Sequence, residues 1–354
     1  MDILTFLLIL VIVASLLYLK SLVYIINVQR RVRTAEESYL DEKPTPITPL
    51  LNFDWKNAKP PVFQDFKPKY NISMGIKTDT PSDLLSIDHD YLDRINKRRD
   101  IIEQYPDTTH GVLPEGNAVV LELYDYLFTQ YLPIRFPTMF QLSPDGQEFK
   151  NLVTQRSFPV KPVDAKSALL NLSEVVEEEL FLLIPSSDSY RLVAFVCCFP
   201  SAFNPAEKLG LLLKEIHGPV PGYDKIRRSM ERFFTKLRVG TPIKRQNWSV
   251  QIHPELFDCE VNDRVKSYDT EDEPKIENTY LRSELQTLTR LPKTWGILFN
   301  FKTYMYKVTD VKAQGQGPQF AEAIEGIRQG NVPEMWEYKG APRWAETVCK
   351  YLRS

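Results

Sequence analysis

Histidine and cysteine are both scarce in this chain. Its 354 residues include four histidines and four cysteines, and there is no Cys-x-x-Cys pair. No two histidines stand at the spacing of a shared metal site. These absences exclude a disulfide framework, an iron–sulfur cluster and the common zinc sites. We therefore expect the folded part in a reducing compartment, and a site built on one histidine remains open.

Excess charge and nucleotide-binding motifs are also missing. Lys and Arg number 44 and Asp and Glu 46, so the net charge is −2 and there is no bulk attraction toward nucleic acid. The chain contains no Gly-x-x-x-x-Gly-Lys-Ser/Thr loop and no Gly-x-Ser-x-Gly nucleophile turn. The run Gln314-Gly-Gln-Gly-Pro ends in a proline that would spoil a phosphate loop. The sequence predicts no nucleic-acid partner and no nucleotide site.

A long apolar run stands at the N-terminus. Residues 3–19 carry no charge, and 1–28 are long enough for a single transmembrane helix. The arginines that follow, Arg30, Arg31 and Arg33, place the rest of the chain on the cytosolic side by the positive-inside rule. A cleaved signal peptide is the competing interpretation, and the lack of positive charge before the run disfavours it. We expect a single-pass anchor in the endoplasmic reticulum membrane with a cytosolic C-terminal domain.

Prolines mark the segment after the predicted anchor. The range 29–64 contains five of them, which predicts an extended and semi-rigid linker. From 65 to 350 apolar residues are dense, without a repeat or a second low-complexity break. We therefore expect one folded domain over this range.

The hydrophobic pattern of this domain alternates between helical and strand periods. Helices are expected at about 82–104, 117–132, 163–180, 205–216, 225–238, 318–329 and 341–352. Strands are expected within 140–153 and at about 181–184, 190–199, 247–253 and 295–308. Because hairpins rather than β-α-β spacings join the strands, the pattern predicts an α+β fold with an antiparallel sheet.

His217 lies in an unusual local sequence. The helix expected over 205–216 ends just before it, and Gly218-Pro-Val-Pro-Gly222 separates it from the next helix. Prolines and glycines forbid a continuous helix there, so His217 stands at a stiff elbow. A histidine fixed in this way suits a metal or haem ligand. The alternative is a helix-terminal histidine that bonds a backbone carbonyl.

A second informative run spans residues 280–292. In it, Arg282, Glu284, Gln286 and Arg290 are interspersed with Leu285 and Leu288, and an extended chain would line a pocket with these polar groups. The alternative is a salt-bridged surface segment, which the pattern alone favours.

Together these two runs resemble the haem-dependent oxidative N-demethylase family, alpha-subunit type. The resemblance covers roughly residues 65–345 and rests on motifs that occur in order. They are Met74-Gly75, Asp90-Tyr91-Leu92-x-Arg94, Leu132-Pro133-x-Arg135-x-Pro137, Phe199-Pro200-Ser201, Glu207-Lys208-x-Gly210, Ile216-His217-x-Pro219-Val220-Pro221-Gly222, Arg245-x-Asn247-Trp248, Arg282-x-Glu284-x-Gln286-Thr287-Leu288-x-Arg290-Leu291-Pro292 and Tyr338-Lys339-Gly340. Two positions, Leu285 and Phe203, depart from the family pattern, where a basic residue and a tryptophan are expected.

The resemblance implies a PAS-like haem domain, with an antiparallel sheet wrapped by helices. It implies haem as cofactor, with His217 as the axial metal ligand. It further implies cofactor contacts from Arg245, Arg290 and Lys339. Catalytic roles fall on Arg282, Glu284 and Gln286.

As an activity, the resemblance implies a monooxygenase that uses O2 to demethylate a small secondary amine, and the predicted N-terminal anchor would attach it to a membrane. Since the chain has no flavin or iron–sulfur motif of its own, electrons must come from a separate NAD(P)H-dependent reductase. Three alternatives stay open. They are a non-catalytic haem-based sensor or binding protein with a PAS-like domain, a haem-free membrane adaptor, and a haem held by the thiolate of Cys197 or Cys198.

Overall fold

A computed structural model describes residues 46–63, 66–187, 189–259 and 274–354. The predicted anchor, 1–28, lies outside these residues. Within the described ranges, no helix is both long enough and apolar enough to cross a bilayer.

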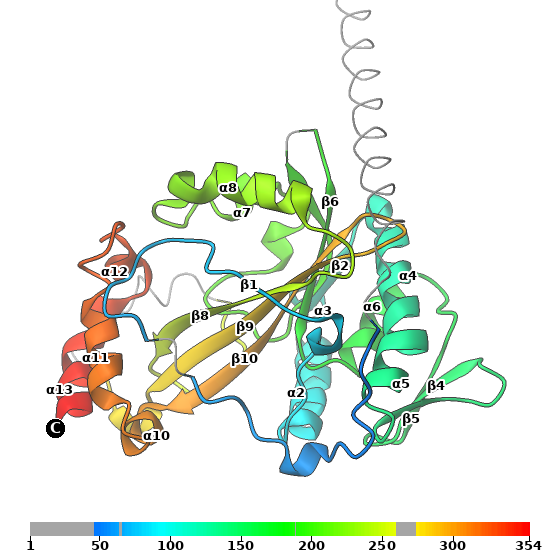
Figure 1. Ribbon diagram of the computed structural model, residues 1–354, viewed down its shortest axis with the longest axis horizontal. Helices are drawn as coiled ribbons and strands as arrows, with labels where there is room; N and C mark the ends of the chain where they lie inside the picture. The colour runs from blue at the N-terminus through cyan, green and yellow to red at the C-terminus, as the bar shows by residue number, and fades with distance from the viewer. Residues whose placement is uncertain (1–45, 64–65, 188, 260–273) are drawn as a thin grey trace, which may run out of the picture.

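A seven-stranded sheet organises the fold, with the order β1-β8-β9-β10-β6-β7-β2 and antiparallel pairing throughout (Figure 1). Its strands are β1 (Lys77–Thr78), β2 (His110–Val112), β6 (Glu179–Pro185), β7 (Tyr190–Val196), β8 (Ile243–Gln251), β9 (Tyr280–Arg290) and β10 (Ile297–Lys307). A separate three-stranded sheet contains β3 (Phe140–Leu142), β4 (Glu148–Asn151) and β5 (Arg156–Pro159). The predicted α+β class with an antiparallel sheet is confirmed, and the likeness to a PAS domain stays a prediction.

Helices cover both faces of the large sheet. They are α2 (Tyr91–Gln104), α3 (Pro106–Thr109), α4 (Asn117–Tyr126), α5 (Leu132–Arg135), α6 (Ala165–Ser173), α7 (Leu213–Ile216), α8 (Tyr223–Lys236), α10 (Val308–Ala313), α11 (Gly317–Glu325), α12 (Met335–Tyr338) and α13 (Ala345–Arg353). A π-helical turn, Leu127–Tyr131, joins α4 to α5.

Three buried clusters hold these layers together. The first joins α2, α4 and α6 to one face of the sheet, with Ile95, Leu123 and Leu298 among its members. The second joins α10, α11 and α13 to the ends of β8 and β9. The third lies on the opposite face, where Phe234 of α8 packs in one cluster with Ile243 of β8 and Leu288 of β9. We call this opposite side of the sheet the α8 face.

The predicted helix over 205–216 is broken. Only a 3-10 turn, Ala206–Lys208, and the short α7 form there, because Gly210 takes a left-handed backbone with φ +83°. Leu212 bridges to Arg191 at the end of β7, which draws this segment along the sheet instead of into one helix.

The second half of the predicted linker packs on the folded domain. Leu50, Phe53 and Trp55 pack against the first cluster, and Phe63 is buried within the second. The backbone N–H of Leu50 donates to the carbonyl of Arg135 at 2.8 Å. The segment is extended, as its prolines predict, but residues 46–63 are part of the packed structure.

Candidate functional site

The elbow at His217 is a tight connection between α7 and α8. The backbone N–H of Val220 donates to the carbonyl of His217 at 2.9 Å, which closes the turn. Gly222 then adopts φ +72° immediately before α8. A Cβ atom at Gly222 would lie 2.4 Å from Cγ2 of Val332, so a glycine is required on steric grounds as well. The sequence prediction of a stiff elbow is confirmed in its backbone.

The imidazole of His217 is held in one tautomer. Its Nδ1 lies 2.9 Å from the carbonyl oxygen of Leu213, and a carbonyl only accepts, so Nδ1 carries the hydrogen. The lone pair therefore resides on Nε2, which has no hydrogen-bond partner among the described residues. The ring also stacks on Tyr223, with centroids 5.0 Å apart and planes at 12°.

Burial lowers the pKa of His217, and the positive charges of Arg245 and Lys208 act in the same direction, against the raising effect of the Leu213 carbonyl. The ring is consequently neutral at physiological pH. A neutral imidazole with one nitrogen tied to a backbone carbonyl is the usual state of a metal-ligating histidine.

A polar floor lies on the α8 face of β8, β9 and β10. Arg245 is paired in register with Gln286, and Asn247 with Glu284. Side chains two residues apart on a strand share a face, so these four point to the same side as Ile243 and Leu288, which pack under α8. We call Arg245, Asn247, Glu284 and Gln286 the polar floor.

Glu284 is the hydrogen-bond centre of the polar floor. Its Oε2 accepts from Nε2 of Gln286 at 2.8 Å and from Nδ2 of Asn247 at 3.3 Å. No further partner of this half-buried carboxylate is found among the described residues. On the neighbouring strand β10, Thr303 lies beside Glu284, and its hydroxyl is buried without a partner. This part of the sheet thus presents oriented polar groups with capacity for a ligand.

Arg245 has a buried guanidinium nitrogen without a partner. Its Nε is enclosed and makes no hydrogen bond within the described residues. Burial lowers the pKa of Arg245, while the nearby Tyr70 and Glu284 act to raise it. Buried polar groups in folded proteins nearly always have partners, so this nitrogen is one that an anionic ligand could satisfy, although Arg94, Arg98 and Arg135 each have such a nitrogen too.

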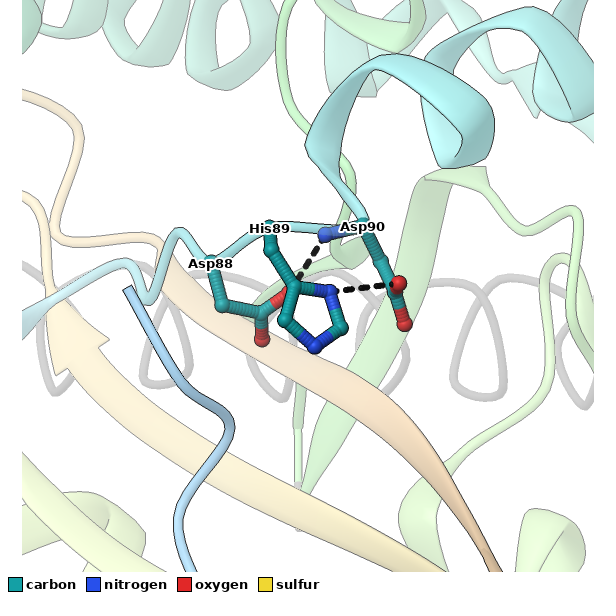
Figure 2. Close-up of side chains that lie close together, drawn as sticks. All are labelled: Asp88, His89 and Asp90. Atoms are coloured by element: carbon teal, nitrogen blue, oxygen red, sulfur yellow. Dashed lines mark hydrogen bonds and ion pairs between the residues drawn. The ribbon is translucent and has the colours of Figure 1, made fainter. Parts of the chain in front are cut away.

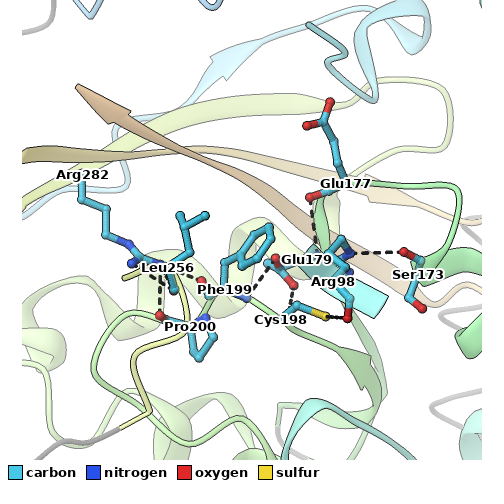
Figure 3. A network of polar contacts seen from close by, with 9 residues as sticks. All are labelled: Arg98, Ser173, Glu177, Glu179, Cys198, Phe199, Pro200, Leu256 and Arg282. Atoms are coloured by element: carbon cyan, nitrogen blue, oxygen red, sulfur yellow. Dashed lines mark hydrogen bonds and ion pairs between the residues drawn. The ribbon is translucent and has the colours of Figure 1, made fainter. Parts of the chain in front are cut away.

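Arg282 and Arg290, which flank the polar floor on β9, bond to oxygens of the protein itself. Arg282 donates to the carbonyls of Phe199 at 2.7 Å and Pro200 at 3.0 Å (Figure 3). It also donates to Oε1 of Gln251 at 2.9 Å. Arg290 donates to the carbonyls of Leu237 at 2.6 Å and Trp295 at 2.7 Å. These bonds tie loops to the two ends of β9. The geometry gives both arginines a structural part, and the catalytic role predicted for Arg282 and the cofactor role predicted for Arg290 gain no support from it.

Lys339 lies apart from the other predicted site residues. Its ammonium donates to the carbonyl of Trp248 and sits 5.6 Å from the centroid of the Tyr70 ring and 5.3 Å from that of Trp248. Trp248 points to the opposite face of the sheet from Asn247, into the second cluster. Lys339 is thus separated from the polar floor by β8, although Tyr70 acts on the pKa of Arg245 and lies near both.

The two departures from the family pattern fall on different faces. Leu285 alternates with Glu284 and Gln286, so it points away from the polar floor, toward the side of Lys302, its neighbour on β10. Phe203 packs in the third cluster, 6.5 Å from Phe181 between ring centroids, and thus lies on the α8 face. The substitution at Leu285 therefore leaves the charge of the polar floor unchanged.

A cleft of about 510 Å³ opens at the elbow. It is lined by Lys214, Glu215, Gly218 to Asp224, and Arg227, which flank His217 in sequence, while His217 itself is not among the lining residues. The volume falls in the usual range for small-molecule sites.

A cluster of Asp88, His89 and Asp90 lies outside this region (Figure 2). Its ligand atoms lie within 4.8 Å of one another. Asp88 is already paired with Lys302 at 2.7 Å and accepts the N–H of Asp90 at 3.0 Å, while Nδ1 of His89 lies 2.7 Å from Asp90. These contacts organise the start of α2, and because the side chains of His89 and Asp90 are 45% and 46% exposed, water can satisfy their remaining atoms and nothing here points to a metal.

Residues 75–349 match the family model described as haem-dependent oxidative N-demethylase, alpha subunit-like. The match covers most of the chain, so the protein belongs to this family, and the resemblance drawn from its motifs is confirmed. As its name states, the family is haem-dependent and its activity is oxidative N-demethylation.

The residues of this chain fit haem as a ligand. A single neutral imidazole with its lone pair on Nε2 provides one axial ligand, which is the common case in haem proteins. The unpaired guanidinium nitrogen of Arg245 offers a donor for a carboxylate such as a propionate. No second ligating histidine is needed. His217 on the elbow would hold the iron and Arg245 on the sheet would hold an anionic group of the cofactor, and haem bound there would supply the activation of O2.

Proposed function

We propose that the protein is a haem-dependent oxidative N-demethylase that removes a methyl group from a small secondary amine. The observation that carries this proposal is the state of His217, a neutral imidazole fixed through Nδ1 and free at Nε2. Family membership supports the same activity class.

When bound, the haem would supply the activation of O2. In the balanced reaction the amine, O2, two electrons and two protons give the demethylated amine, formaldehyde and water. The chain itself has three tasks. His217 holds the iron from the elbow, Arg245 binds an anionic group of the cofactor, and the rest of the polar floor receives the substrate.

Glu284 is the residue we assign to amine binding. A small secondary amine is cationic at neutral pH, so a half-buried carboxylate is the natural counter-charge. Gln286 and Asn247 orient this carboxylate through their amides on Oε2, which leaves Oε1 for an ammonium N–H. Gln286 contributes positioning in this scheme, and Arg282 holds the adjoining loop rather than touching substrate.

We further propose that electrons come from a separate NAD(P)H-dependent reductase. The N-terminal apolar run anchors the chain in a membrane, for which we propose the endoplasmic reticulum with the catalytic domain in the cytosol.

The test compares absorption spectra of the full chain reconstituted with haem, as wild type, His217→Ala and His89→Ala. We expect a Soret band in the wild type and in His89→Ala, whose imidazole lies outside the site, and a shifted or lost band in His217→Ala. An unchanged spectrum in His217→Ala would contradict the ligand assignment. Formaldehyde release from dimethylamine, with a reductase system supplied, separates the enzyme from a non-catalytic haem sensor.

A further inference from the structure

The solvent face of α8 carries a line of positive charge. Lys225, Arg228, Arg232 and Lys236 are all exposed, at spacings of three, four and four residues that place them on one side of the helix. We call these four residues the α8 stripe. The opposite side of the same helix buries Met230 and Phe234 in the third cluster.

The α8 stripe is not neutralised by the protein. No carboxylate pairs with Arg228, Arg232 or Lys236 within the part of the chain that the structure describes. Lys225 donates to a backbone carbonyl, that of Asn331, which leaves its charge uncompensated. Residues 205–240 contain eight Lys or Arg and four Asp or Glu, whereas the whole chain has a net charge of −2. Positive charge is therefore concentrated on α7, the elbow and α8.

The α8 stripe lies next to the predicted iron ligand. It begins two residues after Tyr223, the first residue of α8, whose ring stacks on His217. Lys214 and Arg227 line the cleft between α7 and α8 together with Glu215 and Asp224, and Asp224 pairs with Arg227 at 3.9 Å, so the cleft itself adds no net charge to the α8 stripe. A protein that covers this surface would thus lie beside the helix whose first residue contacts His217.

We propose that the α8 stripe is the docking surface for the electron-donating partner, and that this partner presents an acidic face. The inference rests on the proposed function, which requires electrons from a separate protein. Encounters between redox proteins are brief, bury little area and depend on complementary charge for their speed. Anionic lipid is the less favoured partner, because the described residues place no large exposed apolar side chain on α8 that could enter a bilayer.

The first measurement is binding, which needs no haem. A plant-type [2Fe–2S] ferredoxin, used as an acidic redox probe, is titrated into the full chain at 20 and 300 mM NaCl. We expect affinity to fall with salt, and to fall about tenfold or more at low salt in Arg228→Glu/Arg232→Glu. The matched control is Lys97→Glu/Lys166→Glu, which makes the same change in net charge at exposed positions on α2 and α6 and should bind like the wild type. Equal loss of affinity in both double variants would overturn the proposal.

The second measurement separates docking from the proposed function. Reduction of the bound haem is followed by absorbance, with dithionite and with pre-reduced ferredoxin. The α8 variant should be reduced normally by dithionite and at least tenfold more slowly by ferredoxin. Equal ferredoxin rates in the wild type and the α8 variant would refute the docking surface and leave the haem assignment standing. A chain that binds ferredoxin but takes up no haem would refute the proposed function alone. If Arg228→Glu/Arg232→Glu bound vesicles of 70% phosphatidylcholine and 30% phosphatidylserine more weakly than the wild type but bound ferredoxin equally well, the stripe would be assigned to lipid instead.

Discussion

The domain buries three consecutive acidic side chains, Glu177, Glu178 and Glu179, whose exposed fractions are 4%, 2% and 0%. The sequence predicts them at the polar end of a helix over 163–180, but α6 ends at Ser173 and Glu179 begins β6. Their partners come from distant parts of the chain: Lys302 for Glu177, Ser86 and Asn300 for Glu178, and Arg98 for Glu179. No local pattern could reveal these pairings, because the residues meet only after the sheet has formed.

Glu178 is expected to make stability fall as pH rises. Burial raises the pKa of its carboxyl to about 7. The folded state therefore keeps a proton that the unfolded chain loses near pH 4.5, and the resulting stabilisation disappears between about pH 4.5 and pH 7. In urea unfolding at pH 5 and pH 8, Glu178→Gln should reduce the difference between the two free energies of unfolding by about 2–3 kcal/mol. An identical pH dependence in both proteins would show that Glu178 does not titrate in this range.

Arg98 is expected to be among the most costly residues to replace. It is wholly buried and donates to Oε1 of Glu179 at 2.6 Å, while the two Glu179 oxygens also accept the N–H groups of Cys198 and Phe199 (Figure 3). Arg98→Met leaves a buried carboxylate without its counter-charge, which costs about 3–5 kcal/mol in free energy of unfolding. The double variant Arg98→Met/Glu179→Gln should recover part of this loss, since no buried charge remains. A double variant that is less stable than Arg98→Met would contradict this account.

At the scale of elements, strong periodic patterns predicted the structure well. The hairpin of β6 and β7, the long strand β10 and the closing helices α11 and α13 all occur where their alternation or helical spacing indicated. The segment 280–292 was ambiguous, because its pattern fits either a charged surface segment or a pocket wall. Only pairing with β8 and β10 decides that it is an interior strand, and such pairing is not written in the segment itself.

The elbow between α7 and α8 depends on Gly222. An added methyl would both strain the left-handed backbone and meet Val332 at 2.4 Å. We expect Gly222→Ala to lower the free energy of unfolding by about 2–4 kcal/mol, with about 1 kcal/mol from the backbone and the rest from overpacking. Gly240→Ala is the matched control, because Gly240 also has a left-handed backbone, with φ +73°, but a Cβ added there would meet no atom within 4 Å. Equal losses in the two variants, read from thermal or urea unfolding, would remove Val332 from the explanation.

At the scale of the molecule, the sequence predicts where the site lies, but not which of its residues face a ligand and which have a structural role. His217 and the polar floor stand close enough for the charge of Arg245 to act on the imidazole pKa, as the motifs led us to expect. Arg282, Arg290 and Lys339 belong to the same motifs, yet they bond to backbone carbonyls. A family motif contains residues that contact ligands as well as residues that hold the fold together. Only the bonding partners seen in the structure show which residue is which.

The packing of residues 46–63 predicts where the chain can be shortened. A chain that begins at residue 46 keeps all of the described packing and should unfold cooperatively. A chain that begins at residue 66 loses the buried Phe63, worth roughly 2 kcal/mol of apolar burial, and the partly buried Phe53 and Trp55, which contribute less. Its urea midpoint should fall markedly with a reduced m-value. Equal midpoints for the two shortened chains would show that the segment is dispensable.

The two arginines that end the polar floor also fix its length. Arg282 and Arg290 lie on one continuous strand, roughly 27 Å apart at the usual rise per residue. Arg282 bonds the segment at Phe199, and Arg290 bonds the segment at Leu237. β9 therefore fixes the spacing between the two parts of the domain that these arginines bond. Inserting or deleting a single residue between them would turn one arginine to the opposite side of the sheet and release the segment that it bonds. Substitutions on β9 between the two arginines leave this spacing unchanged, whereas a change in the number of residues does not.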